Sequence, residues 1–189
     1  MVAVERRGVR GMDRDAPDRM TRGRLVAIDG IDLPAVRAAA RDVIRKMGAP
    51  HGASYWDASG VFHELGLVDG SASPRTLLLL YAADLAFRVR WEIVPALAEG
   101  RTVVAAPYVA TATAFGRAVG LPSAWLANLL QFAPRHTESR IVEPERAALP
   151  RAAGFVSVAC ERWAVHAGVD RAALAREMAR HLRWRRARR

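Results

Sequence analysis

The segment from residue 24 to residue 37 constrains the fold of this chain more than any other part of the sequence. Its apolar run, residues 25–29, predicts a short buried strand of a parallel sheet, and the run ends in Asp-Gly. A helix is predicted over residues 34–47, because Pro34 suits a first turn and Gly48 follows the last periodic residue. A strand that leads through a glycine turn into a helix predicts an α/β architecture.

A phosphate-binding loop of the form G-x-x-x-x-G-K-[ST] occupies this kind of junction in nucleotide-binding proteins. Gly30 supplies the first glycine, but Ala35, Val36 and Arg37 stand where the second glycine, the lysine and the hydroxyl residue belong. Pro34 also removes one backbone N–H donor. The junction therefore keeps the position of a phosphate loop without the groups that hold phosphate and Mg²⁺.

The remaining pattern predicts a helix-rich α/β fold with a parallel sheet. A second buried strand is expected at residues 102–106, and residues 139–143 form a poor strand candidate. Residues 49–73 read as loop with a short helix near residues 58–65. Helices are expected over residues 74–98, 110–119, 123–132, 151–167 and 171–186.

Length and composition fit one domain, residues 23–189, preceded by a polar, basic and disordered segment, residues 1–22. No apolar run approaches the length of a membrane span, no signal peptide is recognised, and the single cysteine excludes an internal disulfide. A cytoplasmic location without membrane association is expected. The net charge is +10, and the tail at residues 180–189 carries much of it. It reads as a solvated helix end, and a nucleic-acid partner is not expected because no binding motif accompanies it.

Residues 77–116 carry a resemblance to a known family. The helix contains Tyr-Ala-Ala-Asp-Leu and ends in Pro-Ala-Leu-Ala-Glu-Gly, and the following strand leads into Ala-Pro-Tyr. This order resembles thymidylate kinases, which have F-x-A-[DN]-R, P-A-L-x-x-G, a strand and then D-R-Y. Residues 28–32, Ile-Asp-Gly-Ile-Asp, resemble the family's F-E-G-I-D, and residues 153–155 resemble its late A-G-F segment. The resemblance covers about residues 24–187, and it implies a reduced, helix-rich, three-layer α/β fold of the P-loop kinase type with a parallel sheet.

The resemblance also identifies what the ATP side of the site has lost. Val36 and Arg37 replace the lysine and the Mg²⁺-binding hydroxyl, and Ala106 and Pro107 replace the aspartate and arginine of D-R-Y. Little room remains before Gly154 for the family's arginine-bearing lid. Phosphoryl transfer depends on positioning and charge neutralisation, so we expect no ATP-dependent kinase activity and no bound cofactor. The five histidines show no metal spacing, and no metal site is expected.

The acceptor side is less altered. The resemblance implies that Asp32 bonds the acceptor sugar and that Tyr81 stacks on its base, while Leu85 replaces the arginine that holds the acceptor phosphate. Arg88, one helical turn further on, is the substitute candidate for an anionic group. The expected substrate-binding residues are Asp32, Tyr81, Arg88, Tyr108, Thr111 and Phe115, and no catalytic residue is assigned. The retained residues also have a structural interpretation: Asp32 as a helix cap, and Tyr81, Tyr108, Thr111 and Phe115 as packing residues.

Two functions remain open at this point. The first is a pseudo-kinase that has lost ATP binding and acts as a dimerising or partner-supporting subunit, through a homodimer or heterodimer formed by the apolar helix at residues 74–98. The second is a repurposed enzyme of small-molecule biosynthesis, a lyase or transferase that works without ATP. It would use the old acceptor cleft on a phosphate- or sulfate-bearing substrate, an anionic small molecule. The sequence does not decide whether the chain is an enzyme.

Overall fold

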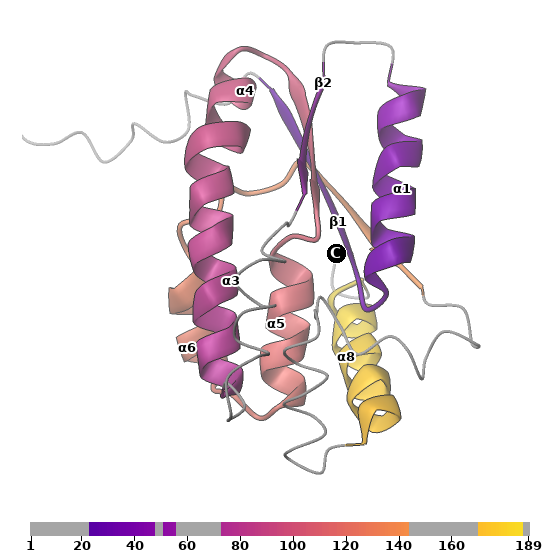
Figure 1. Ribbon diagram of the computed structural model, residues 1–189, viewed down its shortest axis with the longest axis vertical. Coiled ribbons are helices and arrows are strands. Elements are labelled where there is room, and N and C mark those ends of the chain that lie inside the picture. Colours follow the sequence, from indigo (N-terminus) through magenta and orange to yellow (C-terminus); the bar gives the residue numbers. More distant parts are fainter. Residues whose placement is uncertain (1–22, 48–50, 56–72, 144–169, 187–189) are drawn as a thin grey trace, which may run out of the picture.

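The computed structural model describes residues 23–47, 51–55, 73–143 and 170–186, which form a parallel sheet flanked by helices (Figure 1). The elements in chain order are β1 (Arg24–Gly30), α1 (Leu33–Lys46), β2 (His51–Tyr55), α3 (Pro74–Arg88), the π-helical η1 (Val89–Ile93), α4 (Val94–Ala98), β3 (Thr102–Ala106), α5 (Val109–Ala118), α6 (Ser123–Leu130), β4 (Glu138–Val142) and α8 (Arg171–Arg186). Strands and helices alternate along much of the chain, as the sequence predicts.

The four strands lie in the order β2-β3-β1-β4, and every pairing is parallel. In the central pair Arg24 faces Thr102 and Ala27 faces Ala105, which confirms the predicted neighbours. Because all strands run the same way, their carboxyl ends meet at one edge of the sheet. Ligand sites of open α/β sheets lie at this edge, so the junctions that follow β1 and β3 are the places to examine.

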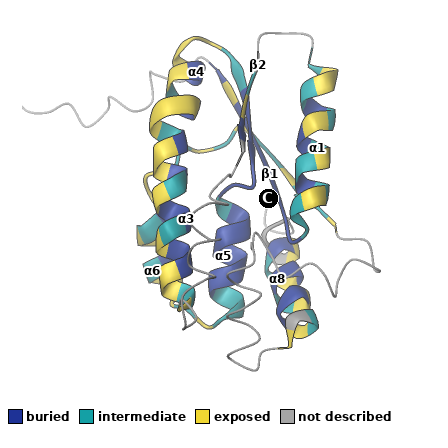
Figure 2. Ribbon diagram, viewed as in Figure 1, coloured by how far each residue is buried: buried dark blue, intermediate teal, exposed yellow. Residues whose placement is uncertain are grey.

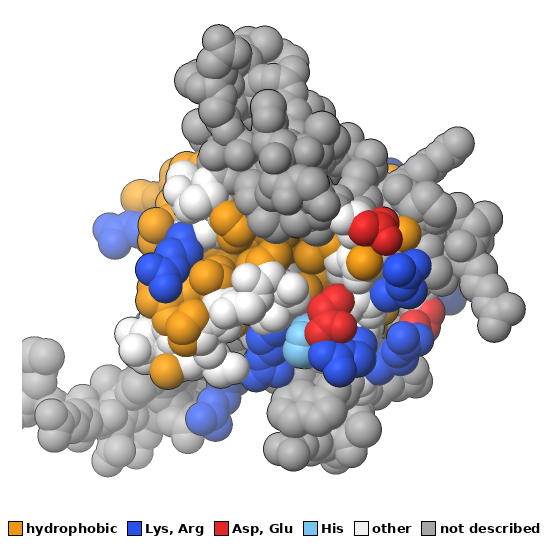
Figure 3. Space-filling view, turned by 90° about the horizontal axis from the view of Figure 1, so that it is seen from below, with side chains coloured by type: hydrophobic (Ala, Val, Ile, Leu, Met, Phe, Trp, Pro, Cys, Tyr) orange, Lys and Arg blue, Asp and Glu red, His pale blue; other side chains and the backbone are white. Residues whose placement is uncertain are grey.

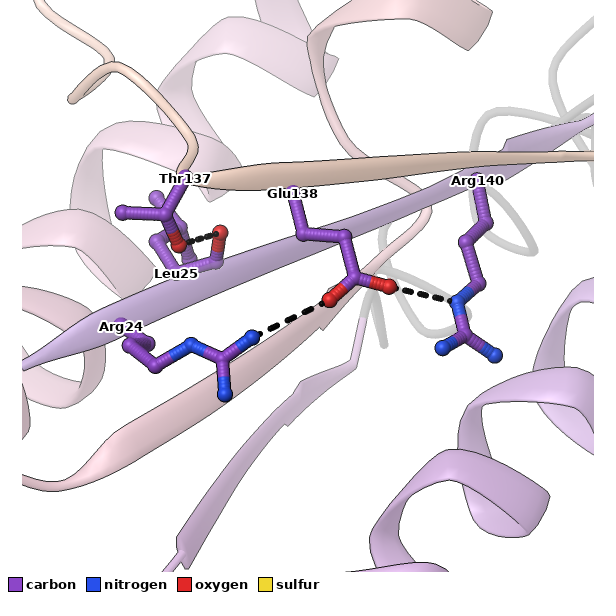
Figure 4. Close-up of polar contacts among 5 residues, drawn as sticks. All are labelled: Arg24, Leu25, Thr137, Glu138 and Arg140. Carbon is purple, nitrogen blue, oxygen red and sulfur yellow. Dashed lines mark hydrogen bonds and ion pairs between the residues drawn. The ribbon is translucent and has the colours of Figure 1, made fainter.

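Residues 139–143 were a poor strand candidate in the sequence, but the structure shows that β4 is a regular strand at the edge of the sheet. It has few large apolar side chains, and polar contacts with β1 accompany its pairing (Figure 4). The Thr137 backbone N–H and hydroxyl both donate to the Leu25 carbonyl, at 2.8 and 2.9 Å. Glu138 pairs with Arg24 at 3.3 Å across the strands and with Arg140 at 2.8 Å along its own strand.

Strand β2 was not predicted, because residues 49–73 read as loop. Its sequence, His-Gly-Ala-Ser-Tyr, has no β-branched residue and contains a glycine, so propensity alone does not identify a strand. Its pairing with β3 compensates, since Gly52 and Ser54 lie in register with Val103 and Ala105. Tertiary pairing therefore overrides a weak local preference.

Two apolar cores, one on each face of the sheet, establish the three layers. Alternate side chains of the central strands point to opposite faces. Val26, Ile28 and Val104 pack with α1, whereas Leu25 and Ala27 pack with the helices of the other face, α3, α5, α6 and α8. In Figure 2, α1 and α3 each show a buried and an exposed side, whereas α5 is buried along most of its length. The predicted three-layer α/β class is confirmed.

The predicted long helix at residues 74–98 is continuous but contains one π-helical turn. Helices α3 and α4 flank η1, and Gly100 follows with a φ of +76° that favours glycine. Its two faces differ sharply. Leu77, Leu78, Tyr81 and Leu85 are fully buried, whereas Leu79, Phe87 and Trp91 are 53%, 60% and 61% exposed.

Several predictions fall outside the described residues. They are the disordered segment at residues 1–22, the helix end at Gly48, the short helix near residues 58–65, the helix at residues 151–167 and the A-G-F segment at residues 153–155. None of these is tested by the structure.

Candidate functional site

The junction between β1 and α1 is short. Only Ile31 and Asp32 separate the end of the strand at Gly30 from the start of the helix at Leu33. Asp32 is the N-cap of α1, because its carboxylate accepts from the Ala35 N–H at 3.4 Å and its carbonyl accepts from the Val36 N–H at 2.9 Å. The capping interpretation of Asp32 is therefore confirmed, and a carboxylate already lies at the helix end that would face a phosphate.

Val36, at the position of the lysine in a phosphate loop, belongs to the apolar core. Its side chain is fully buried among Val26, Ile28 and Ala40 on the α1 face of the sheet. The packing at the strand end is close: a methyl group added to Gly30 would lie 2.7 Å from Val36 Cγ2 and 3.0 Å from the Val142 carbonyl oxygen. Residue 36 therefore points into the protein, and its side chain is not available to a ligand.

Helix α8 packs against the same junction. Ile31 is fully buried, and together with Ile141 and Val142 of β4 and Ala179 and Leu182 of α8 it lines a narrow void. Figure 1 places α8 below the carboxyl end of β1 and the first turn of α1. The void next to the strand–helix junction is therefore lined mostly by apolar side chains, with Glu143 as the charged exception.

A buried hydrogen-bond network joins β1 to the start of α5. The Asp29 carboxylate is 1% exposed, and its Oδ1 accepts from the Tyr108 N–H, the Thr111 N–H and the Thr111 hydroxyl at 2.9, 2.9 and 2.7 Å. Thr111 Oγ1 in turn accepts from the Gly30 N–H at 3.1 Å. Asp29 thus holds the first turn of α5 against the end of β1, and its charge is compensated by three donors.

Two buried tyrosines continue this network. The Tyr81 hydroxyl donates to the Tyr108 carbonyl at 2.8 Å, and the Tyr108 hydroxyl donates to the Pro134 carbonyl at 2.7 Å. Burial raises the pKa of both phenols far above the usual value, and the negative charge of Asp29 raises it further. Arg88 opposes this effect on both tyrosines, because its positive charge lowers their pKa. Both phenols are neutral hydrogen-bond donors at neutral pH.

Arg88 is the largest fully buried side chain in the described part of the chain, at 2% exposure. Its Nε lies 2.8 Å from Asp84 Oδ2 and its Nη1 lies 3.5 Å from Ser54 Oγ, while its Nη2 makes no hydrogen bond to any described residue. Burying a guanidinium nitrogen without an acceptor is costly, so an acceptor oxygen beside this atom would stabilise the folded chain.

The structure brings four of the six predicted residues into one connected region. Asp29, which the sequence analysis did not single out, joins Tyr108 to Thr111; Tyr81 is bonded to the Tyr108 carbonyl, and Arg88 interacts with Tyr81. Phe115 packs in the same core as Tyr81, fully buried. Asp32 caps α1 separately. The signal for Asp29 was present in the sequence, as an acidic residue at the end of a buried strand.

A cavity of about 380 Å³ opens beside this network, between the first turn of α5 and residues 130–136. Asp29 and Tyr108 form part of its wall with His136, whose ring meets the Tyr108 ring edge-on at a centroid distance of 6.5 Å. Tyr108 is the one predicted site residue among its lining residues. His136 has no distinguishing sequence signal and was missed.

The described residues show neither a metal-ligand cluster nor a membrane-spanning helix. They contain no group of three or more histidine, cysteine, aspartate or glutamate side chains that could hold a metal ion. Within the same ranges, no helix combines the length and the apolar character that a membrane crossing requires.

Comparison with known proteins supports the family resemblance over part of the chain. No protein-family model matches. A probable thymidylate kinase of Pyrococcus horikoshii is 41% identical over 73 residues, which cover 38% of this chain and 36% of the relative. A probable thymidylate kinase of Pyrococcus abyssi is 40% identical over 70 residues, covering 36% of this chain and 34% of the relative. The matches span about a third of these curated relatives, and with the parallel-sheet fold they support a thymidylate-kinase-like relationship for this chain.

Proposed function

We propose that this chain is a pseudo-kinase: a thymidylate-kinase-like protein that has lost ATP binding and acts as a subunit of a dimer or of a complex. The burial of Val36 is the observation that supports the loss of ATP binding. A phosphate loop places a lysine charge on the phosphates and leaves bare N–H groups around them. Here the corresponding side chain is apolar and contributes to the core instead.

Electrostatics at the helix end favour the same conclusion. The Asp32 carboxylate accepts the Ala35 N–H, and Pro34 has no N–H to offer. A triphosphate brought to this position would meet a negative side chain and a reduced set of donors. Ile31 and Leu182 add apolar packing next to the junction. Loss of charge, donors and space together argues against nucleotide binding more strongly than any one replacement.

Thermal unfolding with and without MgATP tests this half. A ligand at one hundred times its dissociation constant stabilises the folded state by about 2.7 kcal/mol. For a chain of this size that corresponds to a rise in the unfolding midpoint of roughly 5–11 °C. We expect no rise at millimolar MgATP. A magnesium-dependent rise of several degrees would contradict the proposal.

The proposed subunit role rests on an exposed apolar stripe on the helix that runs from α3 to α4. Leu79, Ala83, Phe87 and Trp91 recur at four-residue spacing on the solvent side, and the Phe87 and Trp91 rings lie 6.5 Å apart. Large apolar side chains gathered on one face are a common mark of an interface.

The stripe is suited to packing against the same helix of a second copy of this chain, with the two helices antiparallel. With the two-fold axis beside Phe87, Trp91 of one copy faces the small Ala83 of the other, and Leu79 faces Pro95. Trp91 then lies opposite a small residue, and the two Phe87 rings meet near the axis, which allows the helices to approach closely. A heterologous partner with an apolar groove is the alternative occupant.

Sedimentation analysis tests the subunit role. We expect the unaltered chain to exceed the 20.7 kDa monomer mass and Phe87→Ser with Trp91→Ser to shift it toward the monomer. Phe132→Ser is the matched control, because Phe132 is also an exposed aromatic but lies beyond α6. A monomer at high concentration, with no partner recovered through the stripe, would contradict the proposal.

One observation favours the alternative, a repurposed enzyme that binds a phosphate- or sulfate-bearing small molecule. Arg88 is buried next to the neutral Tyr81 hydroxyl, and within the described ranges its Nη2 has no hydrogen-bond acceptor. An anionic oxygen would accept a hydrogen bond from that nitrogen, whereas the apolar side chain of Leu85 offers no acceptor. Calorimetry with sulfate and with a nucleoside monophosphate tests the idea. Arg88→Leu should abolish binding, while Arg90→Leu, which changes an exposed arginine two residues further along the chain, should not.

A further inference from the structure

The cavity of about 380 Å³ beside the first turn of α5 has one buried acidic group and one exposed basic group in its wall. The acidic group is Asp29, which is 1% exposed, and the basic group is Arg135, which is exposed. Much of the remaining wall is apolar and includes Leu130, Ala133 and Pro134. The volume lies within the range of about 300–1,000 Å³ that small-molecule sites occupy.

The protein uses only one oxygen of the Asp29 carboxylate as an acceptor. Oδ1 accepts all three side-chain hydrogen bonds, from the Tyr108 N–H, the Thr111 N–H and the Thr111 hydroxyl. Oδ2 accepts none from any residue in the described ranges. The Tyr108 hydroxyl donates to the Pro134 carbonyl and is therefore already engaged. Because a buried carboxylate oxygen without a donor is costly, a ligand that donates to Oδ2 would be bound favourably.

Arg135 supplies a positive charge that the protein does not neutralise. Several other arginines are ion-paired: on the face seen in Figure 3, acidic side chains lie against basic ones and a histidine, and Glu177 of α8 pairs with Arg180 and His181. Arg135, by contrast, forms no ion pair or hydrogen bond with the part of the chain that the structure describes. Its guanidinium is therefore open to an acidic group of a ligand.

These two charges select the class of ligand. A carboxylate only accepts hydrogen bonds, so the group at Asp29 Oδ2 is a donor, and an ammonium group makes the strongest bond of this kind. A guanidinium only donates, so the group at Arg135 is an acceptor, and a carboxylate fits it best. A simple cation or a simple anion would meet one like charge in the cavity, whereas a zwitterion meets an opposite charge at each end.

We propose that this cavity binds a free amino acid with an apolar side chain. The ammonium group donates to Asp29 Oδ2, the carboxylate pairs with Arg135, and the side chain packs against Leu130 and Pro134. The described lining residues include neither Val36 nor Arg88 nor the exposed stripe on α3, so the site is independent of the proposed function.

Calorimetry of the full chain at pH 7 and low salt tests the proposal with three probes. They are L-phenylalanine, phenethylamine, which lacks the carboxylate, and 3-phenylpropionate, which lacks the ammonium group. We expect L-phenylalanine to bind most tightly and 3-phenylpropionate most weakly, because the ammonium group bonds to the buried partner.

Two variants and a control locate the site. Asp29→Asn keeps an amide oxygen for the three donors of Oδ1 and places an NH₂ group where Oδ2 was, so it should weaken L-phenylalanine by about tenfold or more. Arg135→Gln should weaken it roughly two- to fivefold, since an exposed ion pair contributes less. Arg41→Gln is the matched control, because Arg41 is also exposed and has no ion pair among the described residues, but lies on α1 at the other face of the sheet.

Each outcome has a defined meaning. Weakening by Asp29→Asn and Arg135→Gln but not by Arg41→Gln, with unchanged unfolding midpoints, supports the site. No heat with L-phenylalanine, or 3-phenylpropionate bound as tightly, overturns it. Phenethylamine bound as tightly as L-phenylalanine overturns the amino-acid assignment, because Arg135 then takes no carboxylate. If Asp29→Asn does not fold, the three probes and Arg135→Gln still decide, since Arg135 is exposed and lies outside the core.

Discussion

Replacing Val36 by lysine restores the phosphate-loop residue in sequence but should damage this protein. Val36 is fully buried between α1 and the sheet. Removing the valine forfeits about 1.5–3 kcal/mol of apolar burial, and an unpaired ammonium in the same place costs several kcal/mol more. We therefore expect Val36→Lys to lower the free energy of unfolding by at least about 4 kcal/mol, against a typical total of about 5–15 kcal/mol.

Urea denaturation followed by circular dichroism measures this loss. Ala38→Lys is the matched control, because Ala38 is exposed on the same helix, and it should change stability by less than about 0.5 kcal/mol. If Val36→Lys does not fold, Val36→Thr keeps the volume and should still cost about 1 kcal/mol through its buried hydroxyl. Equal stability of Val36→Lys and Ala38→Lys, or MgATP binding gained by Val36→Lys, would refute the reasoning, because residue 36 would then face a ligand.

Three further predictions follow from the same structure. Asp29→Ala leaves three buried donors without their acceptor and should lower the free energy of unfolding, measured by urea denaturation, by about 3 kcal/mol or more. The control Glu99→Ala, at an exposed residue, should lower it little. Similar losses in the two variants would contradict the network. Because the pKa values of Tyr81 and Tyr108 are raised, both phenols should stay protonated at pH 11 in the folded chain, and absorbance at 295 nm should show tyrosinate from them only after unfolding. The unfolded chain releases these protons from about pH 10 upward, so stability should be fully present below pH 10 and fall as pH rises above it, by up to about 1.4 kcal/mol per pH unit for each tyrosine.

The sequence predicted the elements whose local pattern and tertiary setting agree. Strand β3 matches its predicted range, and α8 matches within the described residues. In both segments the local sequence pattern favours the same secondary structure as the tertiary packing does. The poorly patterned strands β2 and β4 were missed or doubted. Both lie at the edges of the sheet and depend on backbone pairing with β3 and β1, which leaves little trace in composition.

The candidate site was predicted less completely than the fold. The sequence pointed to Arg88, and it left Asp32 open between cap and ligand; the structure confirms the cap, and the ligand role stays a prediction. The role of Asp29 could not be read from the sequence, because its donors, Tyr108 and Thr111, are about eighty residues away in the chain. Helix α8 packing against Ile31 is likewise a long-range contact that no local pattern records.

Calorimetric titration with MgATP tests the central claim most directly, with an active thymidylate kinase titrated in parallel as the positive control. The account predicts no heat beyond dilution up to millimolar nucleotide, with or without Mg²⁺, because Val36 is buried and Asp32 caps the helix end. A magnesium-dependent dissociation constant in the micromolar range would contradict it, and would mean that the junction of β1 and α1 binds nucleotide after all.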